Sequence, residues 1–149
     1  MRVEMARFEI HPQLLADCHP LGCFQLCHVL LHKNSLVPWF ILVPENPVMD
    51  LLDLSQELSS AAMSEAARVS HFIKTVLGWP KVNFAAIGNL VPQLHLHVVG
   101  RRPDDPCWPA PVWGNLTASR EYSATDLARM IAQLTERCGL KQINAGSAT

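Results

Sequence analysis

Apolar residues recur at three- and four-residue steps from about Ser55 to Leu77, and this spacing places them along one stripe of a helix. Asp53 or Ser55 is available as the N-cap, while Gly78 and Pro80 follow as signals that stop a helix. The pattern therefore predicts a long helix with one buried face.

A second stretch with helical spacing runs from Ser123 to Cys138. Ser123 and Asp126 stand at the positions of a capping-box variant, and Gly139 is placed as the terminator. The pattern predicts a C-terminal helix over about 123–138, followed by a frayed tail over 142–149.

Four short apolar segments between turn signals predict strands. They are Cys23 to Lys33, Pro38 to Val43, Lys81 to Ile87 and Gln93 to Gly100. The first two are adjacent and predict a hairpin, and the five-residue loop between the last two fits an antiparallel connection. Together the elements predict an α+β fold: an antiparallel sheet of about five strands, one long helix packed on it and a C-terminal helix.

Length and composition narrow the class of protein. A chain of 149 residues without internal repeats or a linker predicts one domain over 1–149. Hydrophobic content of 49% with 17% charged residues is typical of a folded chain. The net charge of -1 leaves no excess of positive charge for non-specific nucleic-acid binding, so we expect no nucleic-acid partner.

The longest uncharged run, residues 82–100, is nineteen residues long and therefore has the length of a membrane span. Its asparagines, histidines, proline and glutamine make that interpretation unfavourable, because each unsatisfied polar group costs several kcal/mol in hydrocarbon. Charged residues within 1–10 leave no apolar core for a secretory signal, and five cysteines without a CxxC pair indicate reduced thiols. We therefore expect a cytoplasmic protein without a membrane partner.

Gln93, His95 and His97 alternate with leucines in a predicted strand, so their side chains are expected to share one face. Side chains two residues apart lie about 6.5–7 Å apart, which lets two imidazoles and an amide surround one phosphate-sized anion. The preceding Gly88-Asn89 loop can add a backbone N–H and a side-chain amide. Neutral imidazole is also a nucleophile near pH 7. The alternatives for this pattern are a solvated sheet face and a metal site that uses both histidines.

These motifs resemble the histidine triad (HIT) superfamily of nucleotide hydrolases and transferases over about residues 23–115, with the triad region at 81–115. The family alternates three histidines with apolar residues, and residues 93–99 read QLHLHVV. PWFILVP at 38–44 resembles the family's LVIP strand, GNLVP at 88–92 replaces its Gly-Gln-Ser loop, and CWP at 107–109 resembles a later Trp-Pro segment. The resemblance implies a homodimer in which two sheets join.

The resemblance assigns roles to the motif residues. His95 matches the middle histidine, the nucleophile that forms a nucleotidyl-histidine intermediate, and His97 matches the third, which contacts the phosphate. Gln93 occupies the first position of the triad. Any catalytic role of its side chain would therefore have to work without proton transfer. Asn89 replaces the loop amide that binds phosphate oxygens.

Three further residues are expected to bind substrate. Asn83 lies near the family's asparagine on the preceding strand, and Asn34 lies near the acidic residue that holds the ribose hydroxyls. Trp108 lies in a proline-rich loop with Trp113, where large aromatic side chains stack on nucleotides or fill the core.

Two departures from the family pattern concern proton transfer. Gln93 replaces the first histidine of the triad, and Trp39 stands where the family often has a histidine. Neither side chain transfers a proton, and loss of a general acid or base typically costs about 10²–10⁴ in rate. Activity on poor leaving groups is therefore expected to suffer, although the nucleophile is present.

The resemblance thus implies an enzyme that hydrolyses or transfers at the α-phosphate of nucleotide conjugates such as dinucleoside polyphosphates. No cofactor is expected in the protein itself. Mg²⁺ would enter only as an ion bound to a polyphosphate substrate. The alternatives are a nucleotide-binding module with little catalysis and a metal-binding protein. A structural zinc site among the cysteines and histidines of residues 18–32 is disfavoured by their spacing.

Overall fold

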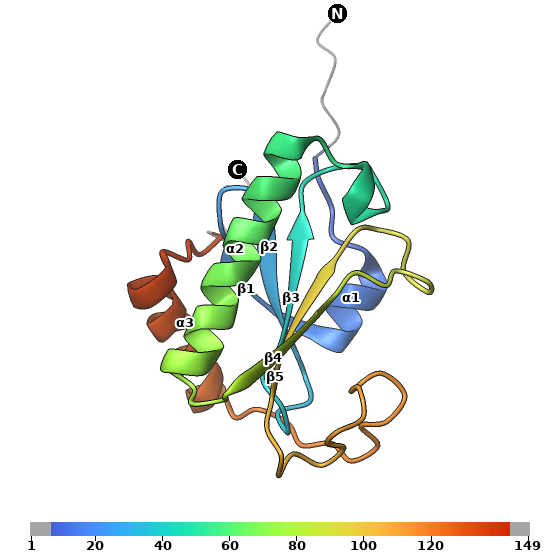
Figure 1. Ribbon diagram of the computed structural model, residues 1–149. Coiled ribbons are helices and arrows are strands. Elements are labelled where there is room, and N and C mark those ends of the chain that lie inside the picture. The colour runs from blue at the N-terminus through green and yellow to red at the C-terminus, as the bar shows by residue number, and fades with distance from the viewer. Residues whose placement is uncertain (1–6, 144–149) are drawn as a thin grey trace, which may run out of the picture.

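The computed structural model describes residues 7–143, so all but the first two residues of the predicted tail at 142–149 lie outside the described residues. Five strands form one antiparallel sheet in the order β1-β2-β3-β5-β4 (Figure 1). The strands are β1 (Cys18–Cys23), β2 (Cys27–His32), β3 (Trp39–Pro44), β4 (Lys81–Ala85) and β5 (Leu96–Arg101). The helices are α1 (Pro12–Asp17), α2 (Gln56–Thr75) and α3 (Ala124–Cys138), with a 3-10 turn at Leu51–Asp53. The predicted α+β fold is confirmed.

Both predicted helices begin and end where their sequence signals stand. Ser55 caps α2, because its side chain accepts a hydrogen bond from the backbone N–H of Leu58 at 3.2 Å. Ser123 and Asp126 form the capping box of α3, and Gly139 ends that helix in the left-handed conformation with φ 71°. Local capping chemistry therefore sets both helix lengths.

The strands differ in detail from the prediction. The apolar segment at 23–33 does not form one strand, because residues 24–26 turn the chain between β1 and β2. The last strand begins at Leu96 rather than at Gln93. α1 and β1 were not predicted, and they add the short helix and the outer strand that complete the fold.

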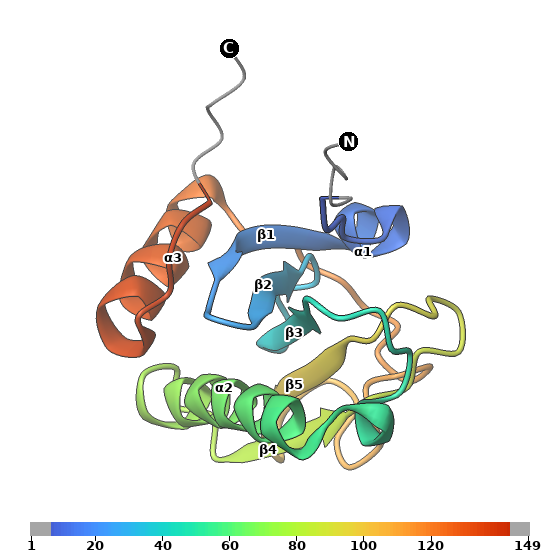
Figure 2. The ribbon, with the colours of Figure 1, turned by 90° about the horizontal axis from the view of Figure 1, so that it is seen from above.

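The sheet has two faces with different covers, which are visible when it is viewed from above (Figure 2). α2 and α3 cover one face and bury apolar side chains of β1, β2, β3 and β5, while β4 contributes the partly buried Val82. α1 and the loop after β5 lie over the other face, where a smaller apolar cluster surrounds Trp39, Ile41 and Val99. Burial of apolar area on both faces supplies the main stabilisation of the fold.

The loop after β5 is held by a buried ion pair. Arg101 Nε donates to Asp105 Oδ2 at 2.8 Å, and the two side chains are 1% and 0% exposed. Arg101 also donates to the Ala110 carbonyl at 2.7 Å. The irregular, proline-rich segment therefore has a defined path over the sheet. Over residues 7–143, no helix is both long and apolar enough to cross a membrane.

Candidate functional site

His95 and His97 lie side by side at the start of β5, on the face that α2 and α3 leave uncovered. Their ring centroids are 4.9 Å apart, and both residues are 7% exposed. His97 pairs with Ile41 in the register of β3 and β5, whereas His95 precedes the strand. Two imidazoles are thus brought together, as the alternating sequence predicts.

The ring orientation of His95 is set by the backbone. Its Nδ1 lies 2.7 Å from the Gln93 carbonyl oxygen. A carbonyl only accepts hydrogen bonds, so Nδ1 carries the proton and Nε2 of the neutral ring keeps its lone pair. His95 is therefore oriented with an unprotonated nitrogen available for nucleophilic attack.

His97 has the opposite arrangement. Its Nδ1 accepts a hydrogen bond from the indole Nε1–H of Trp39 at 3.0 Å, so the proton of the neutral ring is on Nε2. Burial, with smaller contributions from the nearby His95 and His32, lowers the pKa of His97 to about 3. His97 is uncharged at neutral pH and can donate one hydrogen bond from Nε2.

A cavity of about 520 Å³ opens over the two histidines. Aromatic, apolar and polar side chains line it: Gln13, Leu14, Asp17, His32, Trp39, Ile41, Ile87, Gly88, Asn89, Leu90, Val91, His95, His97 and Trp113. This volume is within the range of small-molecule sites. The arrangement places an oriented nucleophile and a neutral donor at the wall of a ligand-sized cavity.

The predicted phosphate loop is part of the same cavity. Gly88 has φ 65°, a left-handed conformation that glycine adopts without a steric penalty, and it lies beside the exposed Asn89. Both residues line the cavity with the two histidines. The structure thus brings together His95, His97 and Asn89 from the predicted set.

Gln93 does not line this cavity. Its Oε1 accepts from the His11 backbone N–H at 2.8 Å, and its Nε2 donates to the Glu9 carbonyl at 2.9 Å. The predicted strand does not extend to Gln93, since β5 begins at Leu96, and the Gln93 side chain is bonded to the backbone before α1 rather than lining the cavity with His95 and His97. Gln93 holds the segment that leads into α1.

The other three predicted binding residues also lie outside the cavity. Asn34 bonds to the Ala118 carbonyl at 2.9 Å and accepts from the backbone N–H of Leu36, so it supports loops. Asn83 accepts from Arg101 Nη1 at 2.9 Å. Trp108 is 38% exposed and stacks under the Arg101 guanidinium, 5.6 Å from its ring centroid. The partners of Asn34 and Asn83 lie 84 and 18 positions away in sequence, and one sequence does not reveal such contacts.

Several cavity residues were not predicted. His32 stacks on Trp39 with ring centroids 4.3 Å apart and an interplanar angle of 12°. Trp113, rather than Trp108, lies edge-on to His97 at 5.2 Å. Asp17 comes from α1, whose Pro12 at the first turn was a helix-start signal that sequence reasoning could have used.

A metal centre is not formed by the described side chains. Among residues 7–143, no three His, Cys, Asp or Glu side chains lie where they could hold a metal ion. The cysteines and histidines of 18–32 spread over two strands, with Cys18 and Cys27 buried as thiols. The disfavoured zinc interpretation gains no support from this geometry.

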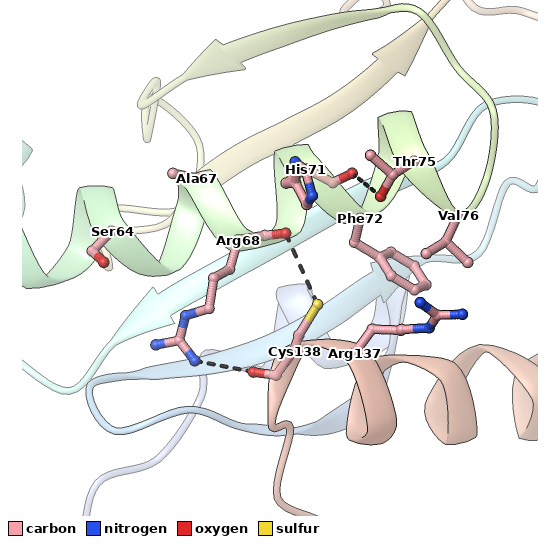
Figure 3. Close-up of a pocket in the computed structure, with 9 residues that line it drawn as sticks. All are labelled: Ser64, Ala67, Arg68, His71, Phe72, Thr75, Val76, Arg137 and Cys138. Carbon is pink, nitrogen blue, oxygen red and sulfur yellow. Dashed lines mark hydrogen bonds between the residues drawn. The ribbon is translucent and has the colours of Figure 1, made fainter.

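A second cavity of about 490 Å³ lies between α2 and α3 (Figure 3). Arg68 Nη1 donates to the Cys138 carbonyl at 3.0 Å there, and the Cys138 thiol faces the Arg68 carbonyl at 3.9 Å. These contacts join the two helices. This second cavity lacks the oriented pair of imidazoles. The cavity lined by His95 and His97, called the histidine cavity below, is therefore the candidate site.

The sheet, the glycine loop and the paired imidazoles define an α+β protein with a ligand-sized cavity that two histidines line. The family model of the HIT domain matches residues 15–104. No curated protein matches the sequence.

Solved structures extend the match beyond the family model. A histidine triad protein of Bradyrhizobium japonicum is 37% identical, with a TM-score of 0.81 over 87% of this chain and 96% of that chain. One of Marinobacter aquaeolei VT8 is 38% identical, with a TM-score of 0.82 over 90% and 98%. One of Sinorhizobium meliloti 1021 is 32% identical, with a TM-score of 0.83 over 89% and 98%. The chain belongs to the HIT family.

Proposed function

We propose that the chain is a nucleotide hydrolase or transferase that acts at the α-phosphate of nucleotide conjugates. The observation that carries the proposal is the orientation of His95, whose Nδ1–H is bonded to the Gln93 carbonyl at 2.7 Å and whose Nε2 therefore keeps its lone pair. Family membership supports a nucleotide-binding or nucleotide hydrolase or transferase role.

In the proposed reaction, His95 Nε2 forms a bond to the α-phosphorus while the bond from phosphorus to the leaving group breaks. The leaving group keeps the bonding electron pair. Water then attacks the phosphorus, the N–P bond breaks back to His95, and the proton of the water passes to solvent. His97 Nε2–H and the Asn89 amide stabilise the charge on the phosphate oxygens, which is the electrostatic role that phosphoryl transfer mostly requires.

The preferred substrates are phosphoanhydrides such as dinucleoside polyphosphates. A leaving phosphate departs as an anion, whereas a leaving amine must be protonated as the P–N bond breaks. The Gln93 amide is bonded to the backbone of Glu9 and His11 and is not an acid, and the Trp39 indole is not an acid either, so neither supplies that proton. We expect no resident cofactor, with Mg²⁺ accompanying a polyphosphate chain; turnover with and without EDTA tests this expectation.

The central test combines a turnover screen over nucleotide conjugates with His95→Ala. The substitution should abolish turnover and leave nucleotide affinity within about tenfold, because the imidazole supplies the covalent step and only one of several contacts. Brief mixing with an adenine dinucleotide should give an intact mass one nucleotide monophosphate heavier. His71→Ala on the exposed side of α2 is the matched control.

Undiminished turnover in His95→Ala would sink the mechanism. Tight nucleotide binding without an adduct or turnover in the parent protein would favour the second candidate, a binding module with little catalysis. The replacement of two proton-transferring positions by Gln93 and Trp39 is what makes that candidate worth testing. Stoichiometric metal in protein purified without a histidine tag would favour a metal-binding protein.

We further propose that the chain forms a homodimer in which two sheets join. β4 is an edge strand, paired with β5 on one side only among the described strands. Phe84 on this strand and Ile87 just after it are 39% and 43% exposed. An open edge with apolar side chains suits pairing with a second copy. Sedimentation at micromolar concentration should give a dimer, and a monomer would count against it.

A further inference from the structure

One indole contact in the cavity has a direct chemical consequence for His97. Trp39 Nε1 donates to His97 Nδ1 at 3.0 Å, and the two residues are 8% and 7% exposed. An imidazole nitrogen that accepts a hydrogen bond has its lone pair in that bond, so the single proton of the neutral ring is on Nε2. A side chain 58 positions away in sequence thus selects the tautomer of a site histidine.

The indole itself is held firmly. One face of Trp39 stacks on His32, with ring centroids 4.3 Å apart and planes 12° apart. Trp113 lies edge-on to the same indole at 5.9 Å. The backbone of Trp39 pairs with Val99 in the sheet. With neighbours on several sides, the Nε1–H has little freedom to turn away from His97.

We infer that Trp39 is a positioning residue that fixes His97 as an uncharged donor with its Nε2–H directed to the phosphate oxygens. The inference rests on the proposed function and deepens it by giving a role to the tryptophan that replaces a proton-transferring side chain. His95 and His97 then have opposite tautomers, one presenting a lone pair and the other an N–H.

The opposite tautomers of His95 and His97 restrict the class of substrate. A neutral imidazole N–H stabilises negative charge on a phosphate oxygen, yet it is far too weak an acid to give its proton to a leaving group. The leaving group must therefore depart with the electron pair of its bond to phosphorus and without a proton from His97. Phosphoanhydrides meet that requirement, and amine leaving groups do not.

The surroundings of His97 agree with an uncharged ring. His95 and His32 are the titratable groups near it, and Asp17 on α1 is the carboxylate that lines the same cavity. Protonation of His97 on Nδ1 would break the bond from Trp39 and place a positive charge beside two other imidazoles in a buried position. The geometry and the burial favour the same neutral state.

The direct test is a long-range ¹H–¹⁵N spectrum of the imidazoles in the ligand-free protein, with His97 assigned by comparison with His97→Gln. We expect His97 as the Nε2–H tautomer and without titration above about pH 5. A dominant Nδ1–H tautomer, or titration of His97 near pH 6.5, would overturn the inference. This measurement needs neither substrate nor a variant of Trp39.

The variant test uses two tryptophans of the same cavity. Trp39→Phe keeps an aromatic ring against His32 but removes the N–H, so His97 should become a mixture of tautomers and titrate at a higher pH. Trp113→Phe is the matched control, because the buried Nε1 of Trp113 has no hydrogen-bond partner among the described residues. It should leave the tautomer unchanged. Equal spectra in the two variants would contradict the role of Trp39.

The same variants separate this inference from the proposed function. If turnover is present, Trp39→Phe should lower kcat about tenfold, because a donor to the transition state is no longer held in place. The pH profile should also gain an acidic limb, because His97 then titrates at a higher pH. If no turnover is found while the spectra behave as expected, the proposed function fails and the tautomer assignment stands. If turnover is present but the Trp39→Phe profile matches that of the parent, the positioning role fails.

Discussion

The sheet face covered by α2 and α3 and the face that carries the histidines are built differently. On the covered face, long helices with local caps bury a continuous apolar cluster, and the buried Glu65 carboxylate is satisfied by the Leu26 and Cys27 backbone N–H groups. On the open face, a six-residue helix and an irregular loop leave a cavity of about 520 Å³. Regular helices cover the first face, whereas polar contacts between residues distant in sequence hold the segments that line the cavity on the second face.

The open face depends on two tethers. Gln93 joins the chain at Glu9 and His11, just before α1. Arg101 and Asp105 hold the loop that carries Trp113. Burial alone raises the pKa of Asp105, but hydrogen bonds from Arg101 and from the backbone of Arg102 and Cys107 outweigh it and keep the pKa below its usual value. The site therefore relies on a few specific bonds more than on apolar area.

The largest expected effect on stability belongs to the covered face. Phe72 is 1% exposed and meets Phe40 edge-on at 6.2 Å, so Phe72→Ala should lower the free energy of unfolding by about 3–5 kcal/mol. Chemical denaturation measures this loss. Met63→Ala, on the exposed side of the same helix, is the control and should stay within about 0.5 kcal/mol.

The comparison also predicts where function separates from stability. Under conditions in which Phe72→Ala remains folded, its kcat/KM should match that of the parent, because Phe72 does not line the histidine cavity. A loss of kcat/KM in the folded variant would show that the two faces are coupled.

A smaller effect is expected from pH, and it should arise on the open face. The pKa of His97 is lowered from 6.5 to about 3 in the folded chain, mainly by burial. The unfolded chain binds this proton more readily, so the contribution is present above pH 6.5 and is lost as the pH falls toward about 3. We expect a loss of about 3 kcal/mol by pH 4.

Urea denaturation across this pH range checks the expectation. In His97→Gln the decline between pH 6.5 and pH 4 should be shallower, while His71→Ala on α2 should follow the parent. An unchanged slope in His97→Gln would mean that other groups set the acid sensitivity.

The covered face could be predicted from the sequence because its signals are local. The three- and four-residue spacing and the caps at Ser55 and Ser123 lie within the elements they define. By contrast, β1 contains Pro20 and Gly22, which look like strand breakers, and α1 is too short to show a period. Short elements held by tertiary contacts are hard to recognise in one sequence.

Three residues of the candidate cavity could be predicted from the sequence, whereas most of its lining could not. His95, His97 and Asn89 follow from a local alternation and a glycine loop. The place of Asn34 outside the cavity could not be predicted, because its partners Ala118 and Arg120 lie more than 80 positions away. The bond from Trp39 to His97 also joins distant positions, so the role of that tryptophan could not be read from its own neighbourhood.

The smallest expected effect tests the tether at Gln93. Removing both hydrogen bonds in Gln93→Leu should cost about 1 kcal/mol and loosen the segment before α1, whose Asp17 and Gln13 line the cavity. KM for a dinucleoside polyphosphate should rise about fivefold while kcat stays unchanged, because the substitution alters the cavity wall and leaves His95 in place. Gln93→Glu is the matched control: it keeps the acceptor for the His11 N–H, so its KM should lie between those of the parent and Gln93→Leu. If kcat falls in Gln93→Leu at unchanged KM, position 93 takes part in the chemistry, and its placement as a tether outside the site is wrong.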